Sequence, residues 1–143
     1  MPVLKAVIDT SVMVSVAFAK RGLARDLRDM IAEGDFILVT SKQILKELYH
    51  VLHYPHIIKR FAPSEDDINE FIGLIMETAL ISEELYNVHG ITDDPADDMV
   101  VAYAMEANAD YIVSRDPHLR NLKHFHGIQI VDVTTIIEKV KGK

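Results

Sequence analysis

The chain alternates between short continuous apolar runs and longer segments in which apolar residues recur at helical spacing. Continuous runs are typical of strands buried on both faces of a parallel sheet, and the helical spacing is typical of helices that cover such a sheet. The predicted strands are residues 3–8, 36–39, 80–81, 111–113 and 128–131. The predicted helices are residues 12–19, 23–33, 42–53, 64–79, 95–107, 119–122 and 134–140, and a loop is expected over 86–91.

This alternation of strand and helix predicts an α/β fold. We expect one domain over residues 1–143, built as a three-layer α/β/α sandwich whose sheet has four or five mainly parallel strands. Asp9 and Asp116 follow two of these strands, so they should lie at the carboxyl ends of neighbouring strands, where ligands bind in open α/β sheets. Glu47 and Asp97 would approach the same edge from helices.

Local signals define the ends of several helices. Ser41 is placed to cap one helix, and Gly34 is placed to close another. Tyr54-Pro55 is expected to end the helix that Ser41 begins, because proline interrupts a helix interior. Asp94 precedes Pro95, which suits a first helical position, so Asp94 is the expected N-cap.

Composition narrows the class of protein. The 143 residues are 49% hydrophobic and 26% charged, which is ordinary for a globular domain. The absence of cysteine excludes disulfides, thiolate metal sites and a thiol nucleophile. No apolar run reaches membrane-spanning length and the N-terminus lacks a basic region with a cleavage site, so we expect a cytoplasmic protein with no membrane partner.

The net charge of −7 argues at face value against a nucleic-acid partner, because phosphate binding usually depends on lysine and arginine. Acidic residues gathered in one pocket and neutralised by divalent cations would give the same total. The net charge therefore does not decide the partner.

The candidate acids on helices also have an ordinary structural explanation. Asp94 and Asp97 have the spacing of a capping box, and Glu47 at the border of an apolar helix stripe fits an ion-paired or partly buried glutamate. Yet four carboxylates converging from separate elements repel one another, and such a site persists when cations satisfy it. Oxygen-only ligands suit Mg²⁺ or Mn²⁺, and two such ions support phosphodiester hydrolysis.

Four segments of the chain, in this order, resemble the PIN-domain nucleases, and in particular the toxin components of toxin–antitoxin pairs. They are VIDTSV at 7–12, ILKELYHVL at 44–52, DDPADD at 93–98 and ADYIVSRD at 109–116. The resemblance implies that the acidic quartet Asp9, Glu47, Asp97 and Asp116 binds Mg²⁺ or Mn²⁺, with Ser11 and Ser114 as polar support. It further implies endonucleolytic cleavage of RNA and a small antitoxin protein as partner.

Two details of the site stay open at this point. The D-P-x-D pattern of the resemblance selects Asp97 over the adjacent Asp98, which is kept as an auxiliary ligand. Met99 stands where related sequences often carry a lysine or another polar residue, so one substrate contact is missing. The basic residues Arg21 and Arg25 flank the Asp9 edge and can hold phosphates, although a solvated helix face is the alternative.

The leading hypothesis is a metal-dependent ribonuclease, and two others compete with it. One is a non-catalytic PIN-like module that binds RNA or serves as a scaffold. The other is a signalling receiver phosphorylated on aspartate, which needs a lysine after the last core strand, where residues 128–134 have none. A homodimer is also expected, as in the resembling toxins, through apolar residues that one small core would not use: Phe61, Phe71, Leu74 and Ile75.

Overall fold

The structure is a computed structural model that describes residues 3–84, 90, 92 and 94–142. Its strands are β1 (Lys5–Ile8), β2 (Ile37–Ser41), β3 (Leu80–Ser82), β4 (Tyr111–Val113), β5 (His124–Phe125) and β6 (Ile128–Val131). Its helices are α1 (Thr10–Ala17), α2 (Gly22–Glu33), α3 (Lys42–Leu52), α4 (Pro55–Phe61), α5 (Glu65–Thr78), α6 (Pro95–Glu106), α7 (Pro117–Arg120) and α8 (Val133–Lys141). Within these ranges no helix is long and apolar enough to cross a membrane. Of the loop expected over 86–91, only Gly90 lies among the described residues.

The strands form one sheet in the order β3-β2-β1-β4-β6-β5, parallel except for β5. The predicted α/β class with a mainly parallel sheet is confirmed. In the described part of the chain the sheet has six strands, more than the four or five expected. The extra strand β5 joins β6 through His126 and Gly127, both at positive φ, and its two residues are too few to carry a periodic signal.

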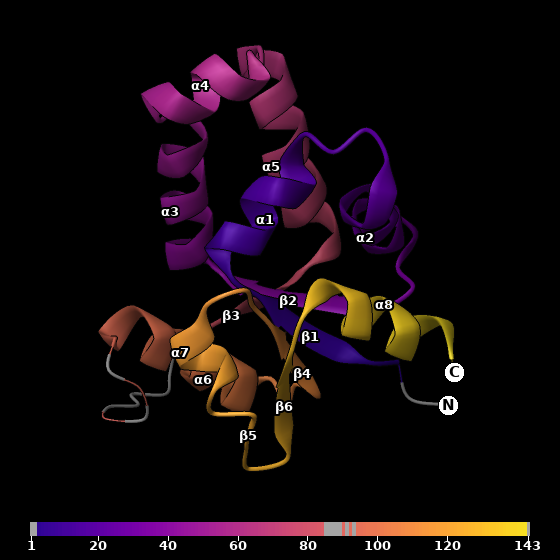
Figure 1. Ribbon diagram of the computed structural model, residues 1–143, viewed down its shortest axis with the longest axis vertical. Coiled ribbons are helices and arrows are strands. Elements are labelled where there is room, and N and C mark those ends of the chain that lie inside the picture. Colours follow the sequence, from indigo (N-terminus) through magenta and orange to yellow (C-terminus); the bar gives the residue numbers. More distant parts are fainter. Residues whose placement is uncertain (1–2, 85–89, 91, 93, 143) are drawn as a thin grey trace.

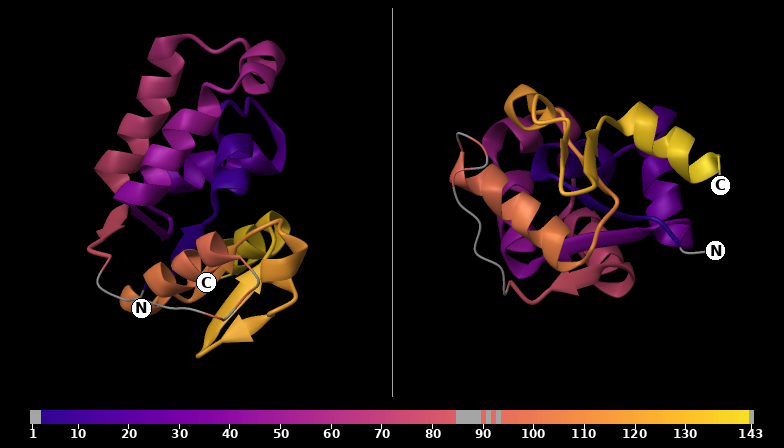
Figure 2. Two further views of the ribbon diagram at one scale, coloured as in Figure 1. Left: turned by 90° about the vertical axis from the view of Figure 1, so that its left-hand side faces the viewer. Right: turned by 90° about the horizontal axis from the view of Figure 1, so that it is seen from below.

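Helices cover both faces of the sheet, as predicted (Figures 1 and 2). Ala6 and Ile8 of β1 belong to a core shared with α1, α2, α3, α5 and α8. Val7, the residue between them, belongs to the opposite core, which α6 closes with Val101 and Ala104. Alternate residues of one strand therefore face different helical layers, which is why the strand is apolar on both faces.

The helix ends agree with the sequence at two points and differ at a third. The Ser41 hydroxyl accepts a hydrogen bond from Ile44 N at 3.0 Å, and Gly34 closes α2 at a φ of +73°. Pro55, however, begins α4 instead of only ending α3. A proline in the first turn costs no hydrogen bond, and the single buried residue of α4, Ile57, gives no stripe to detect.

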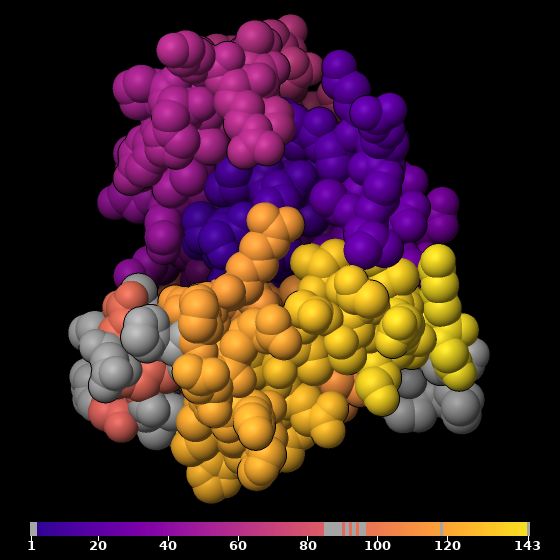
Figure 3. Space-filling model, viewed as in Figure 1, coloured from indigo at the N-terminus to yellow at the C-terminus, as the bar shows by residue number. Residues whose placement is uncertain are grey.

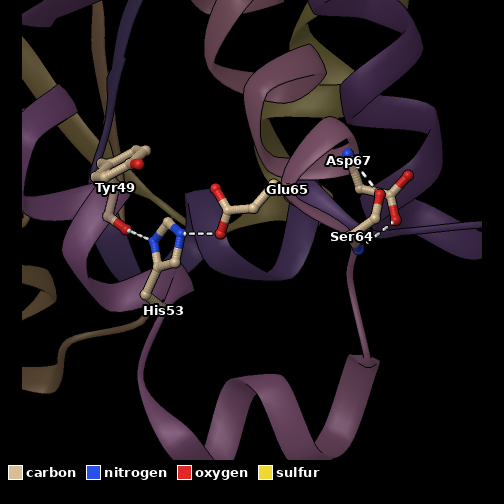
Figure 4. Close-up of polar contacts among 5 residues, drawn as sticks. All are labelled: Tyr49, His53, Ser64, Glu65 and Asp67. Carbon is tan, nitrogen blue, oxygen red and sulfur yellow. Dashed lines mark hydrogen bonds and ion pairs between the residues drawn. The ribbon is translucent and has the colours of Figure 1, made fainter.

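A histidine joins the end of α3 to the start of α5 across the intervening α4 (Figure 4). His53 Nδ1 lies 2.7 Å from the carbonyl oxygen of Tyr49, and its Nε2 lies 2.6 Å from Glu65 Oε1. Both partners are acceptors, so both bonds together require the imidazolium form. The bond to Tyr49 and then the one to Glu65 raise the pKa of His53 above its usual value of 6.5.

The apolar residues expected to mediate dimerisation do not form an exposed patch. Phe71 and Ile75 are fully buried in the core. Phe61 is half-buried against Phe18, with ring centroids 5.4 Å apart, and Leu74 packs on the same core. The homodimer therefore stays a prediction, without the surface that was expected to support it.

Candidate active site

Asp9 begins the site, directly after β1. One of its carboxylate oxygens, Oδ1, accepts hydrogen bonds from Val12 N and from the Ser11 hydroxyl, both at 3.0 Å. Asp9 is thus the N-cap of α1, which explains why this helix starts at Thr10, before the predicted position. Its side chain is almost fully buried, and the burial raises its pKa in spite of these hydrogen bonds.

Ser114 connects Asp9 to the neighbouring strand. It follows β4, whose residue Val113 pairs with Ile8 of β1. The Ser114 hydroxyl donates to Asp9 Oδ2 and accepts from the backbone N–H of Asp116 at 3.0 Å. The side chain of Ser114 is fully buried, so it acts by positioning two carboxylate-bearing segments. The prediction that Asp9 and Asp116 follow neighbouring strands is confirmed.

A cavity of about 200 Å³ lies at this edge of the sheet. The space-filling view shows the surface hollowed over the segment that contains α1, between the helices above it and the C-terminal half below it (Figure 3). Five carboxylates line the cavity: Asp9, Glu47, Asp94, Asp97 and Asp116. The structure therefore brings together all four acids of the predicted quartet, and it adds a fifth, Asp94.

Asp97 is a cavity acid with a strongly raised pKa. Desolvation, followed by the charges of Asp116 and Asp94, raises its pKa from 3.8 to about 6. A hydrogen bond to Asp116 contributes in the same direction, and a carboxyl pair needs a shared proton to make such a bond. Asp97 Oδ2 is buried and has no hydrogen-bond partner among the described residues. Such an oxygen favours a proton or a cation beside it.

Glu47 lines the cavity from α3, but its side chain is exposed. The expectation that this acid is partly desolvated by the apolar stripe of its helix is therefore wrong. The stripe is made by Ile44, Leu48 and Leu52, and Glu47 lies beyond its edge. An exposed glutamate keeps its rotamer freedom and can adjust to a bound ligand.

Asp98 does not line the cavity. It is buried, and its carboxylate accepts hydrogen bonds from Gly90 N at 3.0 Å, from Thr92 N at 2.7 Å and from the Thr92 hydroxyl at 3.0 Å. It anchors the chain that precedes α6. The structure thus supplies a structural role for Asp98 and gives no support to the auxiliary-ligand interpretation.

The two arginines suggested as phosphate contacts lie outside the cavity lining. Arg21 is exposed at the start of α2. Arg25 bonds to the Ala19 carbonyl at 3.3 Å and pairs with Asp29 at 3.1 Å, one helical turn further on. The solvated helix face, weighed as the alternative, describes both residues.

Three residues of the cavity were not found from the sequence as parts of a site. Asp94 was interpreted as a helix cap alone, although its place in D-P-x-D was a usable signal. Tyr103 of α6 was not singled out from the sequence, and its hydroxyl donates to Gln43 Oε1 at 3.2 Å. Both Tyr103 and Gln43 line the cavity, where they add neutral hydrogen-bonding groups beside the acids.

The oxygen atoms that line the cavity are suitable ligands for a hard divalent cation. They are oxygen atoms of several carboxylates, one of which has an unpartnered buried oxygen. Among the described residues, no three acidic or histidine side chains are close enough to form a ready-made metal cluster. The acids therefore line a cavity without forming a complete coordination shell, and Mg²⁺ characteristically keeps several of its waters.

The strand order and the acidic cavity at the edge of the sheet agree with a nuclease-type fold. Residues 5–118 match the model of the PIN domain, so the chain belongs to the PIN-domain family, whose members are generally nucleases. No curated protein matches it in sequence. Among solved structures, it is similar to PAE2754 from Pyrobaculum aerophilum, with a TM-score of 0.62 and 12% identity over 98% of this chain and 91% of that chain. That likeness concerns the fold alone.

Proposed function

We propose that this protein is a metal-dependent endoribonuclease that hydrolyses RNA phosphodiester bonds. The observation that carries the proposal is the convergence of Asp9, Glu47, Asp97 and Asp116 on one cavity. These acids come from the end of β1, from α3, from α6 and from the segment after β4. Acids crowded in this way repel one another, so the site is electrostatically unfavourable without a metal ion. Membership of the PIN-domain family supports nuclease activity as the function for which these acids are gathered.

The four acids would hold Mg²⁺ or Mn²⁺ through oxygen atoms. A divalent cation in such a site lowers the pKa of a water molecule and stabilises the charge on the leaving oxygen. The residues of the chain prepare the site for it. Ser11 and Ser114 fix the Asp9 carboxylate, and the Ser114 hydroxyl also holds the backbone of Asp116.

The exposed side of the cavity is where a phosphodiester would enter. Glu47 and Asp94 are exposed, whereas Asp9 is buried and Asp97 is half-buried. The unpartnered oxygen of Asp97 belongs to the inner part of this acidic set. Substrate phosphate can approach only when the negative charge of the acids is neutralised, which makes activity dependent on the cation.

Cleavage of labelled RNA by Asp9→Asn tests the proposal. Asparagine caps a helix as well as aspartate does, so α1 should persist while the charge is removed. Cleavage in Mg²⁺ or Mn²⁺ should fall by about a hundredfold or more, whereas Glu33→Gln at the end of α2 should match wild type. Circular dichroism would verify both folds. Full activity of Asp9→Asn would overturn the assignment of cleavage to this site, whereas RNA binding without cleavage by the wild type would favour the non-catalytic module.

We further propose that the protein is the toxin of a toxin–antitoxin pair and that it acts in the cytoplasm as a homodimer. The support is the resemblance of the four sequence segments, given above. Expression in a bacterial host should arrest growth, and Asp9→Asn should remove the arrest. Absence of growth arrest with the wild type would contradict the toxin role without touching the nuclease assignment, and arrest that persists with Asp9→Asn would mean that toxicity does not depend on this site. Co-expression with a small neighbouring-gene product would reveal the antitoxin as a protein that co-purifies.

A further inference from the structure

Positive charge is concentrated on one segment of this acidic protein. Residues 42–61, which comprise α3 and α4, contain four basic residues and one acidic residue, in a chain with a net charge of −7. The single acidic residue is Glu47, which lines the cavity together with Gln43 of the same helix. The segment that carries this charge therefore begins at the acidic cavity, with Gln43 and Glu47, and continues along α3 into α4 (Figure 1).

The exposed side of α3 carries two of these four basic residues, Lys42 and Lys46, together with aromatic rings. At about 100° per residue, its members lie within roughly 100° of one another on the helix. They are Lys42, Lys46, Tyr49, His50 and His53, here called the α3 outer face. The buried residues Ile44, Leu48 and Leu52 occupy the opposite side. All members of the α3 outer face are exposed except His53, which is half-buried.

Two tyrosines are open to solvent here. Tyr49 is 41% exposed, and Tyr54 at the junction with α4 is 47% exposed. The ring of Tyr49 packs against His53, with centroids 4.5 Å apart, and Glu65 and the Tyr49 carbonyl hold that histidine in place (Figure 4). The Tyr49 ring is therefore supported on one side while a large part of its surface stays accessible.

Exposed aromatic rings beside basic side chains are the features with which proteins bind single-stranded nucleic acid. Bases stack on the rings, and basic groups follow the phosphates. RNA single strands present unstacked bases for such contacts, whereas duplexes do not. A protein partner fits this surface less well, because lysine is depleted in the cores of protein interfaces.

We infer that the α3 outer face, together with Tyr54, is a binding track for single-stranded RNA that leads from the acidic cavity. Lys42 and Lys46 contact phosphates, and Tyr49 and Tyr54 stack on bases. The inference rests on the proposed function, because the track delivers the strand to the site of cleavage. Acidic residues lie near both ends of the track. Glu84 accepts a hydrogen bond from Gln43 N at 3.3 Å near one end, and Glu65 contacts His53 near the other.

Fluorescence anisotropy with a short labelled single-stranded RNA tests the track in EDTA, where binding is separated from cleavage. Lys46→Gln should weaken binding and reduce the slope of log affinity against log salt by about 0.7, the value for one phosphate contact on a single strand. Tyr54→Ala should weaken binding by about tenfold and leave the salt slope unchanged. Both residues are exposed, so neither variant threatens the fold.

Matched controls lie on other helices. Lys139→Gln removes an exposed lysine of α8, and Met76→Ala removes an exposed apolar side chain of α5. Both should bind RNA as the wild type does. Equal losses of RNA binding in the two controls would overturn the track. Unchanged affinity and salt slope in Lys46→Gln and Tyr54→Ala would overturn it as well, and this is the result expected if a protein partner binds the surface instead. Since no cleavage is measured, a failed track is distinguishable from a failed nuclease.

Discussion

Asp97 and Asp98 are adjacent on α6, yet their carboxylates lie in opposite kinds of surroundings. Asp97 lines the acidic cavity with one buried oxygen that has no partner among the described residues. Asp98 is buried among donors, with three hydrogen bonds from Gly90 and Thr92. Consecutive residues of a helix point about 100° apart, which is enough to separate a candidate ligand from a loop anchor.

This difference predicts opposite outcomes for two isosteric changes. In Asp98→Asn an amide nitrogen replaces an accepting oxygen, so at least one of the three partly buried donors loses its partner. The free energy of unfolding should fall by roughly 1–3 kcal/mol, measured by urea denaturation. Asp97→Asn should be as stable as wild type in EDTA or more so, because it removes one repelling charge, while RNA cleavage is lost.

The opposite result would exchange the roles of Asp97 and Asp98. A stable but inactive Asp98→Asn, combined with an active Asp97→Asn, would identify Asp98 as the ligand. Comparison of both variants at the same urea concentrations separates lost activity from lost structure, which activity alone does not.

The sequence predicted the acids that follow strands more accurately than those on helices. Asp9 and Asp116 directly follow apolar runs, and parallel pairing of β1 with β4 brings such ends together. The role of Asp98 depends on contacts with Gly90 and Thr92, before the helix, and no periodicity encodes them. The exposure of Glu47 depends on how α3 packs, so its position on the helical wheel alone gave the wrong degree of burial.

A similar limit applies to the elements that were missed. α4 has one buried residue and β5 has two residues, so neither carries enough repeats to form a pattern. Tyr103 was hidden for the opposite reason, because α6 is apolar over most of its circumference and a buried tyrosine looks like core. Its hydrogen bond to Gln43 joins residues far apart in sequence, which requires the tertiary fold.

Ser114 should matter for both stability and catalysis. Ser114→Ala removes the donor to Asp9 and the acceptor for the Asp116 backbone, so we expect a loss of roughly 1–3 kcal/mol of unfolding free energy. The rate of RNA cleavage should fall with little change in KM, because a fully buried hydroxyl does not contact substrate. Ser114→Thr retains the hydroxyl and should restore part of the rate. Equal effects of alanine and threonine would show that packing, and not the hydroxyl, is what matters.

Divalent cations should stabilise the folded protein. A ligand that binds only the folded state stabilises it by about 2.7 kcal/mol at a concentration of 100 times its Kd, so Tm should be higher in Mn²⁺ than in EDTA. Asp9→Asn should reduce that difference, because a carboxylate is lost from the cavity. Glu33→Gln, remote from the cavity, should retain it. An identical Tm in excess Mn²⁺ and in EDTA would contradict a metal site formed by these acids.

The contact between His53 and Glu65 should make stability depend on pH. Because the folded pKa of His53 is raised, its contribution is fully present below the unfolded value of about 6.5 and is lost as pH rises through the higher folded value. Thermal unfolding should therefore show wild type to be more stable than His53→Gln at about pH 5.5, with most of that advantage gone by about pH 9.

Glu65→Gln should show a reduced pH dependence, since the Tyr49 carbonyl remains as a partner for the imidazolium. His56→Gln, which changes an exposed histidine of α4, is the matched control and should follow the wild-type curve. A constant difference between wild type and His53→Gln across this range would mean that the histidine stabilises the α3–α5 junction by packing on Tyr49, and not by its charge.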